Sequence, residues 1–291
     1  MAADPPALDR RRNAYRADLA AEALRGKVSA PHYAAGEARQ VVHAAVPLRE
    51  APDAQARWAT QALFGERVTL YEECGGWAWV QLAGDGYVGY LPAPALSPHI
   101  EAPTHWVRAL STWLYARPDF KSPPSLSLSM HAAVRVVAVD AGFARLVDGR
   151  FVPAPHIAEQ RWRAPDFVAV AEGFVGAPYV WGGKTQAGVD CSGLLQLAIQ
   201  ASGRPCPRDS DMQLAEVGER AVVGNDHSGL ARGDLVFWPG HVGIMLDPVR
   251  LLHANAHHMA VAVEPLRDAA QRIARTGQAI AAVKRLPPQP G

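Results

Sequence analysis

One cysteine of the chain lies in a setting that favours a nucleophilic thiol. Cys191 follows Asp190, a good helix N-cap, and precedes the small Ser192. This pattern places Cys191 in the first turn of a predicted helix, where backbone N–H groups and the helix dipole favour a thiolate. The Gly-rich loop 181–188 before it is suited to line a substrate cleft, with Trp181 as a binding residue. We therefore expect Cys191 to be a catalytic nucleophile rather than a buried structural cysteine.

Two histidines are candidates for the base that such a nucleophile needs. His241 begins one predicted strand, and His253 lies in the next one, across a tight turn that forces antiparallel pairing. Pairing Met245 with Arg250 would place His241 opposite Ala254, one position from His253. We expect the two imidazoles to be neighbours. The imidazole of His241 would hold the thiolate as an ion pair and protonate a leaving amine.

A third polar group must fix the orientation of the His241 ring. His253 can do this. Asn255, which lies two residues later on the same face of the strand, is the competitor. From the residues alone, both stay open.

A metal site is the rival chemistry for the same side chains. The spacing of the candidate ligands fits no compact zinc pattern, such as paired C-x-x-C or H-E-x-x-H, and no nucleotide-binding fingerprint is present. We therefore expect neither a metal nor another cofactor. The residues that a metal reading would use are Cys191, His241, His253, His257 and His258.

The composition excludes several other classes of function. The chain has 291 residues and a formal net charge of +1, so no strong field gathers nucleic acid or a membrane surface. No apolar run approaches the roughly 18 residues of a membrane-spanning helix. The N-terminus has an acid at Asp4 and no apolar region, so we expect no secretory signal and a cytoplasmic protein. An odd set of three cysteines fits a reducing compartment. The oligomeric state stays open.

Two stretches of β-like sequence repeat before the cysteine. Each has a strand, a turn and a second strand, followed by similar closing segments at 86–96 and 149–157. A period of roughly 65 residues with about five short strands predicts two small β-barrels, at 36–100 and 101–160. One larger β-sandwich is the alternative.

The segments before and after these repeats have sequence patterns that predict helices. Residues 1–35 contain an Ala-rich stretch, Asn13 to Leu24, that predicts a helix. Within 161–291, one helix is expected after Asp166 and another from Asp190 to Gly203, followed by a run of antiparallel strands. Helices followed by an antiparallel run indicate an α+β domain.

This last segment resembles the NlpC-type family of papain-like cysteine peptidases, which cleave bacterial cell-wall peptides. The resemblance implies that Cys191 is the nucleophile, His241 the base and His253 the orienting third residue. It also implies that the hydroxyl of Tyr179 helps to form an oxyanion hole beside the Cys191 backbone N–H. The motifs that carry it are Pro178-Tyr-Val-Trp-Gly-Gly183, Asp190-Cys-Ser-Gly193, Gly233-Asp-Leu-Val-Phe-Trp238, His241-Val-Gly243 and the later His253.

The two repeats resemble bacterial SH3-like domains, most clearly in Asp85-Gly-Tyr-Val-Gly-Tyr-Leu91. The whole architecture is similar to recycling enzymes that cut between γ-D-glutamate and a diamino acid, either diaminopimelate or Lys, and require a free N-terminal L-alanine. That resemblance implies that Ser192, Asp209 and Tyr87 hold the free amine. A local alternative for Asp209 is the N-cap of the helix that follows it.

These resemblances imply a cytoplasmic γ-D-glutamyl-L-diamino acid endopeptidase that acts on freed murein peptides. A general peptidoglycan hydrolase or an amidase on intact wall is one alternative. A non-catalytic peptidoglycan-binding module is another, and the intact set of Cys191, His241 and His253 argues against it.

Overall fold

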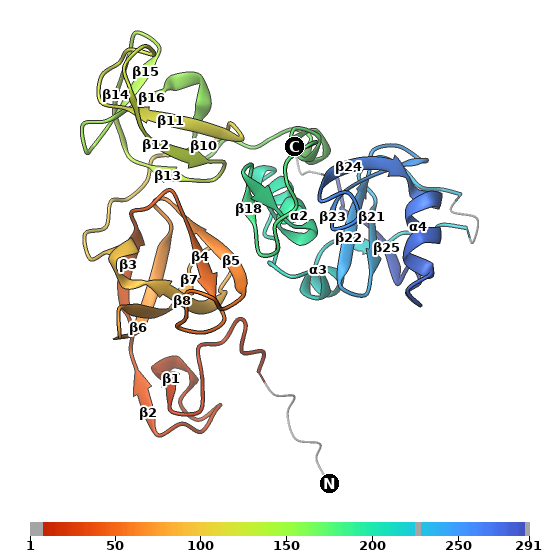
Figure 1. The fold of residues 1–291 in the computed structure, drawn as a ribbon, viewed down its shortest axis with the longest axis horizontal. Coiled ribbons are helices and arrows are strands. Elements are labelled where there is room, and N and C mark those ends of the chain that lie inside the picture. The colour runs from red at the N-terminus through yellow and green to blue at the C-terminus, as the bar shows by residue number, and fades with distance from the viewer. Residues whose placement is uncertain (1–7, 225–227, 289–291) are drawn as a thin grey trace.

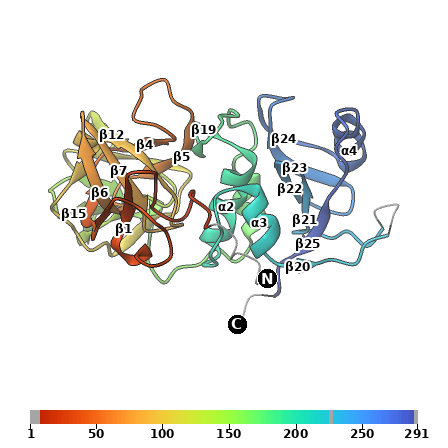
Figure 2. The ribbon, with the colours of Figure 1, turned by 90° about the horizontal axis from the view of Figure 1, so that it is seen from below.

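The computed structural model describes residues 8–224 and 228–288. Two β-rich units lie at one end of the molecule, and a unit of helices and sheet lies at the other, with α2 (Cys191–Ala201) at its inner side (Figures 1 and 2). The residues around Asp4, on which the expectation about a secretory signal rests, lie outside the described ranges.

The N-terminal segment does not form the helix predicted for Asn13 to Leu24. It forms a short parallel pair, β1 (Leu19–Ala21) with β2 (His32–Ala34), and a single 3-10 turn at Glu22–Leu24. Its apolar side chains pack on Trp79 of the next unit, and the Arg16 guanidinium lies 4.6 Å from the Trp79 ring centroid. Helix propensity is a weak preference that such packing overrides.

The first β unit is one seven-stranded antiparallel sheet in the order β5-β4-β8-β7-β6-β3-β9. Alternate residues of its strands point into a separate apolar cluster that includes Leu48, Val80 and Leu91. Its strands are β3 (Glu37–Val41), β4 (Ala45–Arg49), β5 (Trp58–Leu63), β6 (Arg67–Cys74), β7 (Trp77–Leu82), β8 (Val88–Pro92) and β9 (Leu96–Ser97).

The second β unit has a cluster of its own, which includes Val107, Leu128 and Val152. Two separate cores argue against the alternative of one large sandwich. The unit contains a five-stranded sheet in the order β12-β11-β16-β15-β14 and a three-stranded sheet in the order β13-β10-β17. Its strands are β10 (His105–Val107), β11 (Ser111–Tyr115), β12 (Pro124–Ser129), β13 (Ala133–Val134), β14 (Val136–Asp140), β15 (Phe143–Leu146), β16 (Phe151–Pro153) and β17 (Ile157–Glu159).

The repeat appears in the closing segments, but closed barrels do not. In both units a strand ends at proline and leads through a 3-10 turn, Ala93–Ala95 or Ala154–His156, into a last short strand. Among the described residues, hydrogen-bonded strand pairs form open sheets in both units. The two predicted β-barrels are therefore not confirmed as closed structures.

The C-terminal unit is α+β, as predicted. A six-stranded antiparallel sheet, in the order β20-β25-β21-β22-β23-β24, packs against α2, whose side chains are almost all buried. The predicted helix after Asp166 is also present, capped by that carboxylate. No helix in the described ranges has the length and apolar character needed to cross a bilayer.

The remaining elements of this unit are α1 (Phe167–Glu172), α3 (Ser210–Glu216), α4 (Leu266–Ala274), the β18–β19 hairpin (Lys184–Thr185 and Gly188–Val189), β20 (Glu219–Arg220), β21 (Leu235–Trp238), β22 (His241–Met245), β23 (Arg250–Asn255), β24 (Ala260–Pro265) and β25 (Ala282–Arg285).

Candidate active site

Cys191 occupies the first position of α2, where the sequence predicts it. The Asp190 carboxylate caps the helix by accepting from the Gly193 backbone N–H at 2.7 Å. Its other oxygen accepts from the Gly182 N–H at 2.8 Å, so one side chain fixes both the helix start and the Gly-rich loop. Buried Arg208 pairs with the same carboxylate at 2.7 Å. Sequence reasoning did not single out Arg208, whose partners come together only in the fold.

Burial of Cys191 works against the thiolate that the start of the helix favours. Burial, followed by the charge of Asp190, raises the pKa of the Cys191 thiol to about 12. The backbone N–H groups of Val242 and Ser192 lower that pKa, but they do not offset burial. The Val242 contact places the sulfur at the start of β22, next to His241. A base close to the sulfur is therefore needed to remove the proton of the thiol.

The two histidines meet, although the predicted register is wrong by one residue. Met245 pairs with Leu251 rather than with Arg250. This shift places His241 and His253 on one face of the sheet as diagonal neighbours. Nε2 of His241 lies 2.8 Å from Nδ1 of His253. The contact between the two rings that the sequence predicts is confirmed.

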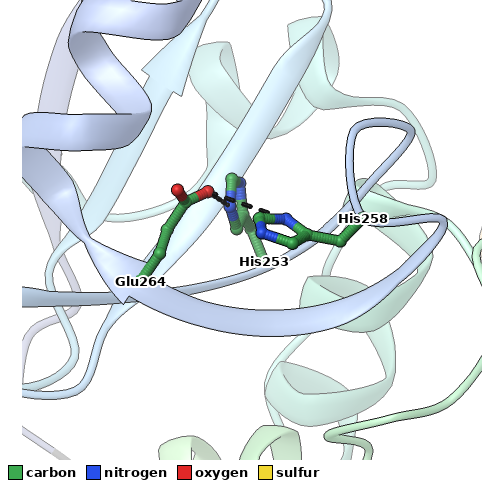
Figure 3. Close-up of side chains that lie close together, drawn as sticks. All are labelled: His253, His258 and Glu264. Atoms are coloured by element: carbon green, nitrogen blue, oxygen red, sulfur yellow. Dashed lines mark hydrogen bonds and ion pairs between the residues drawn. The ribbon is translucent and has the colours of Figure 1, made fainter.

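A carboxylate that sequence reasoning missed extends this pair. Nε2 of His253 lies 2.8 Å from Oε1 of Glu264 in β24 (Figure 3). Arg272 of α4 donates from Nη1 to Oε2 of Glu264 at 2.7 Å and also contacts Oε1. The sequence offered one sign of this contact, because Glu264 is the single acidic residue of the strand 260–265.

The competitor for the third role has a different task. Asn255 accepts the His258 backbone N–H at 2.8 Å through its side-chain oxygen, and so holds the turn after β23. Its side-chain nitrogen donates to the backbone oxygen of His253 at 3.4 Å. The position beside the His241 ring is taken by His253.

We expect His253→Ala to lower turnover far more than Asn255→Ala. Without His253 the ring of His241 loses the partner that fixes its tautomer, and such losses cost about 10²–10⁴-fold in kcat. Asn255→Ala should cost less than about tenfold, because it loosens a turn only. Rates of peptide hydrolysis, measured beside thermal unfolding of each variant, check the order. The reverse order would give the third role to Asn255.

Tyr179 and Trp181 lie on the loop that leads to Cys191. Tyr179 forms an isolated bridge with Val189, and burial, followed by the proximity of Cys191, raises the pKa of its phenol. Trp181 is 61% exposed, so its indole is accessible to a substrate. A Cβ on Gly182 would lie 2.6 Å from Cβ of Trp58, so this loop is packed closely on the first β unit.

The candidates for the amine site come together from two units of the protein. The Tyr87 hydroxyl donates to Oδ2 of Asp209 at 2.8 Å, across the contact between the first β unit and α3. Asp209 stands at the N-cap of α3, but its side chain accepts no capping hydrogen bond. The local alternative of a cap is therefore wrong for this carboxylate. Burial raises its pKa, while Tyr87, Arg208 and Arg11 act against that rise.

Ser192 is connected to this pair through Arg208. The hydroxyl of Ser192 accepts from Nη1 of Arg208 at 2.8 Å, and its backbone oxygen accepts from Gln213 at 2.9 Å. The charge of Arg208 acts in turn on Asp209. The structure thus brings Tyr87 and Asp209 into direct contact and places Ser192 on the other side of the guanidinium.

The N-terminal segment supplies a contact that the sequence did not reveal. Nη1 of Arg11 donates to Oδ2 of Asp209 at 2.8 Å, and Nη2 donates to Asp211 at 2.7 Å. The same guanidinium also pairs with Asp9 at 2.7 Å. Three carboxylates therefore surround one guanidinium and leave an excess of negative charge.

One group of side chains has the spacing of a metal site. The ligand atoms of His253, His258 and Glu264 lie within 4.8 Å of one another (Figure 3). The guanidinium of Arg272 neutralises that carboxylate and repels a cation. The residues present therefore fit a hydrogen-bonded relay better than a metal.

Comparison with known proteins relates this geometry to characterised families. Residues 176–275 match the NlpC/P60 family, and residues 48–96 match the bacterial dipeptidyl-peptidase Sh3 domain. The chain is 27% identical over 246 residues to a γ-D-glutamyl-L-lysine dipeptidyl-peptidase of Bacillus cereus, covering 71% of this chain and 70% of that one. It is 28% identical over 221 residues to the protein of the same name from Bacillus subtilis, covering 67% and 71%.

The fold has a relative among solved structures. A crystal structure of an NlpC/P60 family protein from Bacillus cereus superimposes with a TM-score of 0.71 at 22% identity, covering 86% of this chain and all of that chain. The likeness extends over the β units as well as the catalytic unit, and it supports the papain-like fold of residues around Cys191.

Proposed function

The chain carries an NlpC/P60 cysteine peptidase domain behind a bacterial SH3 domain, and from this premise we propose that it hydrolyses the bond between γ-D-glutamate and a diamino acid. Its substrates are murein peptides that begin with a free L-alanine. The diamino acid is diaminopimelate or Lys, and the names of the two Bacillus relatives favour Lys. The role that follows is recycling of freed cell-wall peptides in the cytoplasm.

One observation carries this proposal, the hydrogen bond between Tyr87 and Asp209. Asp209 is partly buried and already pairs with Arg11 through Oδ2, and a substrate ammonium would be a second partner of the right charge. Both hydrogen bonds that reach Asp209 from the described part of the chain end at Oδ2, so Oδ1 is available to the amine. The excess of negative charge around Arg11 favours the same ligand.

The same contact supports a requirement for a free N-terminus on the substrate. Tyr87 comes from the SH3 domain and closes the subsite over the start of α3. An acyl group or a further residue on the L-alanine would remove the charge and meet the tyrosine. Only peptides whose L-alanine amine is free would then fit the subsite.

The proposed mechanism uses Cys191 as nucleophile and His241, at the start of the strand beside the sulfur, as base. The sulfur attacks the γ-carbonyl carbon of D-glutamate while its proton passes to His241, and the carbonyl oxygen gains negative charge. The Cys191 backbone N–H and the Tyr179 hydroxyl stabilise that oxyanion. The C–N bond then breaks, and the imidazolium of His241 donates its proton to the leaving amine. Water hydrolyses the remaining thioester with His241 as base.

Mass spectrometry of the products tests the function. L-Ala-γ-D-Glu-L-Lys, its diaminopimelate analogue and the N-acetylated form of each are incubated with the enzyme. We expect L-Ala-γ-D-Glu from the free peptides and almost none from the acetylated ones. Equal cleavage of both forms would indicate a general wall hydrolase. Release of a stem peptide from its sugar, with a muropeptide as a further substrate, would indicate an amidase. Labelling of Cys191 by a thiol reagent without any cleavage would indicate a binding module.

A further inference from the structure

We propose that Glu264, held by Arg272, is a positioning residue that fixes the tautomers of His253 and His241. Through this chain His241 presents an unprotonated Nδ1 to the thiol of Cys191. The inference rests on the proposed cysteine peptidase mechanism and extends it by two residues that lie outside the Cys–His–His set.

The first step is the charge of Glu264. Burial would raise the pKa of this carboxyl, but the hydrogen bonds from Arg272 and His253 hold it at about 2. Glu264 is therefore ionised at neutral pH and can only accept hydrogen bonds. Its side chain is 11% exposed, so water competes little for Oε1. Nε2 of His253, 2.8 Å away, must carry a hydrogen atom.

The second step passes this constraint to His241. Burial lowers the pKa of His253, so the ring is neutral and has a single N–H, the one that points to Glu264. Its Nδ1 is then an acceptor, and Nε2 of His241 must donate to it across 2.8 Å. Burial lowers the pKa of His241 to about 3, so this ring is neutral as well. The free lone pair of His241 is at Nδ1, the nitrogen left to take the thiol proton.

The third step concerns the imidazolium that forms during catalysis. When His241 takes the proton, a positive charge appears in a buried site beside Trp238, whose ring centroid lies 5.6 Å away. The charge of Glu264 raises the pKa of His241, whereas Arg272 lowers it. His258, 3.9 Å from Glu264, also faces the carboxylate. Glu264 thus stabilises the protonated base through His253, as a carboxylate does in a Ser–His–Asp triad.

Glu264→Gln tests the relay, because the amide keeps the size of the side chain and can donate to Nε2 of His253. That donation reverses both tautomers and puts an N–H of His241 against the thiol. We expect kcat to fall about 10- to 100-fold, as for other residues that orient a reactive group at one remove, with KM within about twofold of wild type. Glu264→Asp should recover part of the loss. Asp268→Asn, an exposed acid in the first turn of α4, is the matched control and should change neither constant.

A second readout does not depend on the substrate. The rate at which iodoacetamide alkylates Cys191 is followed against pH by peptide mass spectrometry. Glu264 raises the pKa of His241. Removal of the Glu264 carboxylate should therefore move the acidic limb of the alkylation-rate profile to lower pH and lower the rate at its plateau. If the proposed substrate is wrong, the effect of Glu264→Gln on the alkylation rate should still be seen. The experiment therefore tests the positioning role of Glu264 independently of the proposed function.

Coupling to His253 completes the test. Glu264→Gln should add little to the loss in His253→Gln, because both act on one chain of contacts. Additive losses, or an unchanged pH limb with normal kcat, would overturn the relay. If Glu264→Gln does not fold, Arg272→Gln tests the same series of hydrogen bonds, because Arg272 holds the Glu264 carboxylate. We then expect a several-fold fall in kcat at constant KM, and normal kcat would again overturn the proposal.

Discussion

Cys191→Ala is expected to abolish hydrolysis and to leave the fold intact. The variant keeps the oxyanion donors and the binding residues but has no group that can form the thioester, so kcat should fall at least about 10⁴-fold. Alanine is a good helix former, and the Asp190 cap of α2 does not involve the sulfur. Hydrolysis of the free tripeptide, followed by chromatography, and thermal unfolding of the same sample check both halves of the prediction.

The other two cysteines are matched controls for this variant. Cys74 is exposed at the end of β6, and Cys206 is buried next to Pro207. Cys74→Ala should change neither stability nor turnover. Cys206→Ala should lower the unfolding temperature through the cavity it leaves, with turnover unchanged. Near-normal turnover in Cys191→Ala would contradict the covalent mechanism.

The local parts of the site were accessible from the sequence. The helix that carries Cys191 depends on the cap at Asp190 and on the apolar face of the residues after it, and both are short-range features. The pairing of the two histidine strands was also accessible, but its register was not. The Asp247 carboxylate accepts from the Val249 and Arg250 backbone N–H groups, which stabilises a turn one residue longer than predicted and moves the pairing by one residue.

The contacts that join distant segments could not be predicted in this way. Glu264 reaches His253 only because β24 lies beside β23 and α4 returns with Arg272. Arg11 contacts Asp209 although the two residues are 198 positions apart in the sequence. No spacing rule encodes such pairs, since they depend on how complete units pack.

The same limit explains one error of architecture, the N-terminal helix, and one prediction that is not confirmed, the closure of the β-barrels. The Ala-rich segment before residue 25 has helix propensity, but it gains more by covering Trp79 as an extended chain. In the β units the order of strands and closing segments was visible as a repeat. A barrel closes only if the first and last strands of a unit form hydrogen bonds with each other. That pairing depends on long-range geometry that the repeat does not contain, and the sheets are open.

Asp209→Asn is expected to remove the preference for a free N-terminus. In the wild-type subsite the substrate ammonium is taken from water, and an unpaired charge there is costly. The Asp209 carboxylate, with the Tyr87 hydroxyl 2.8 Å from Oδ2, supplies the partner. Loss of that carboxylate should cost about 2–5 kcal/mol of binding to the free peptide, which corresponds to about 30- to 4,000-fold in kcat/KM.

N-acetylation of the peptide removes the other half of the same ion pair. The acetylated peptide should lose a similar factor with the wild type, and more if the acyl group meets Tyr87. With Asp209→Asn the two peptides should differ much less, because the contact that separates them is already absent. The two losses are thus strongly non-additive if they report one interaction. Tyr87→Phe should lie between the wild type and Asp209→Asn, since it removes one hydrogen bond and keeps the charge.

Asp211→Asn is the control that separates the amine contact from the general field of the acidic cluster. Asp211 shares Arg11 with Asp209, and its side chain is 61% exposed, so water screens its charge. Its loss should change kcat/KM for the free peptide less than about threefold and leave the discrimination against the acetylated peptide in place. If Asp211→Asn abolishes that discrimination while Asp209→Asn retains it, the ammonium binds at the other carboxylate. If the wild type cleaves both peptides equally, the subsite does not recognise an amine, and the recycling role loses the observation on which it rests.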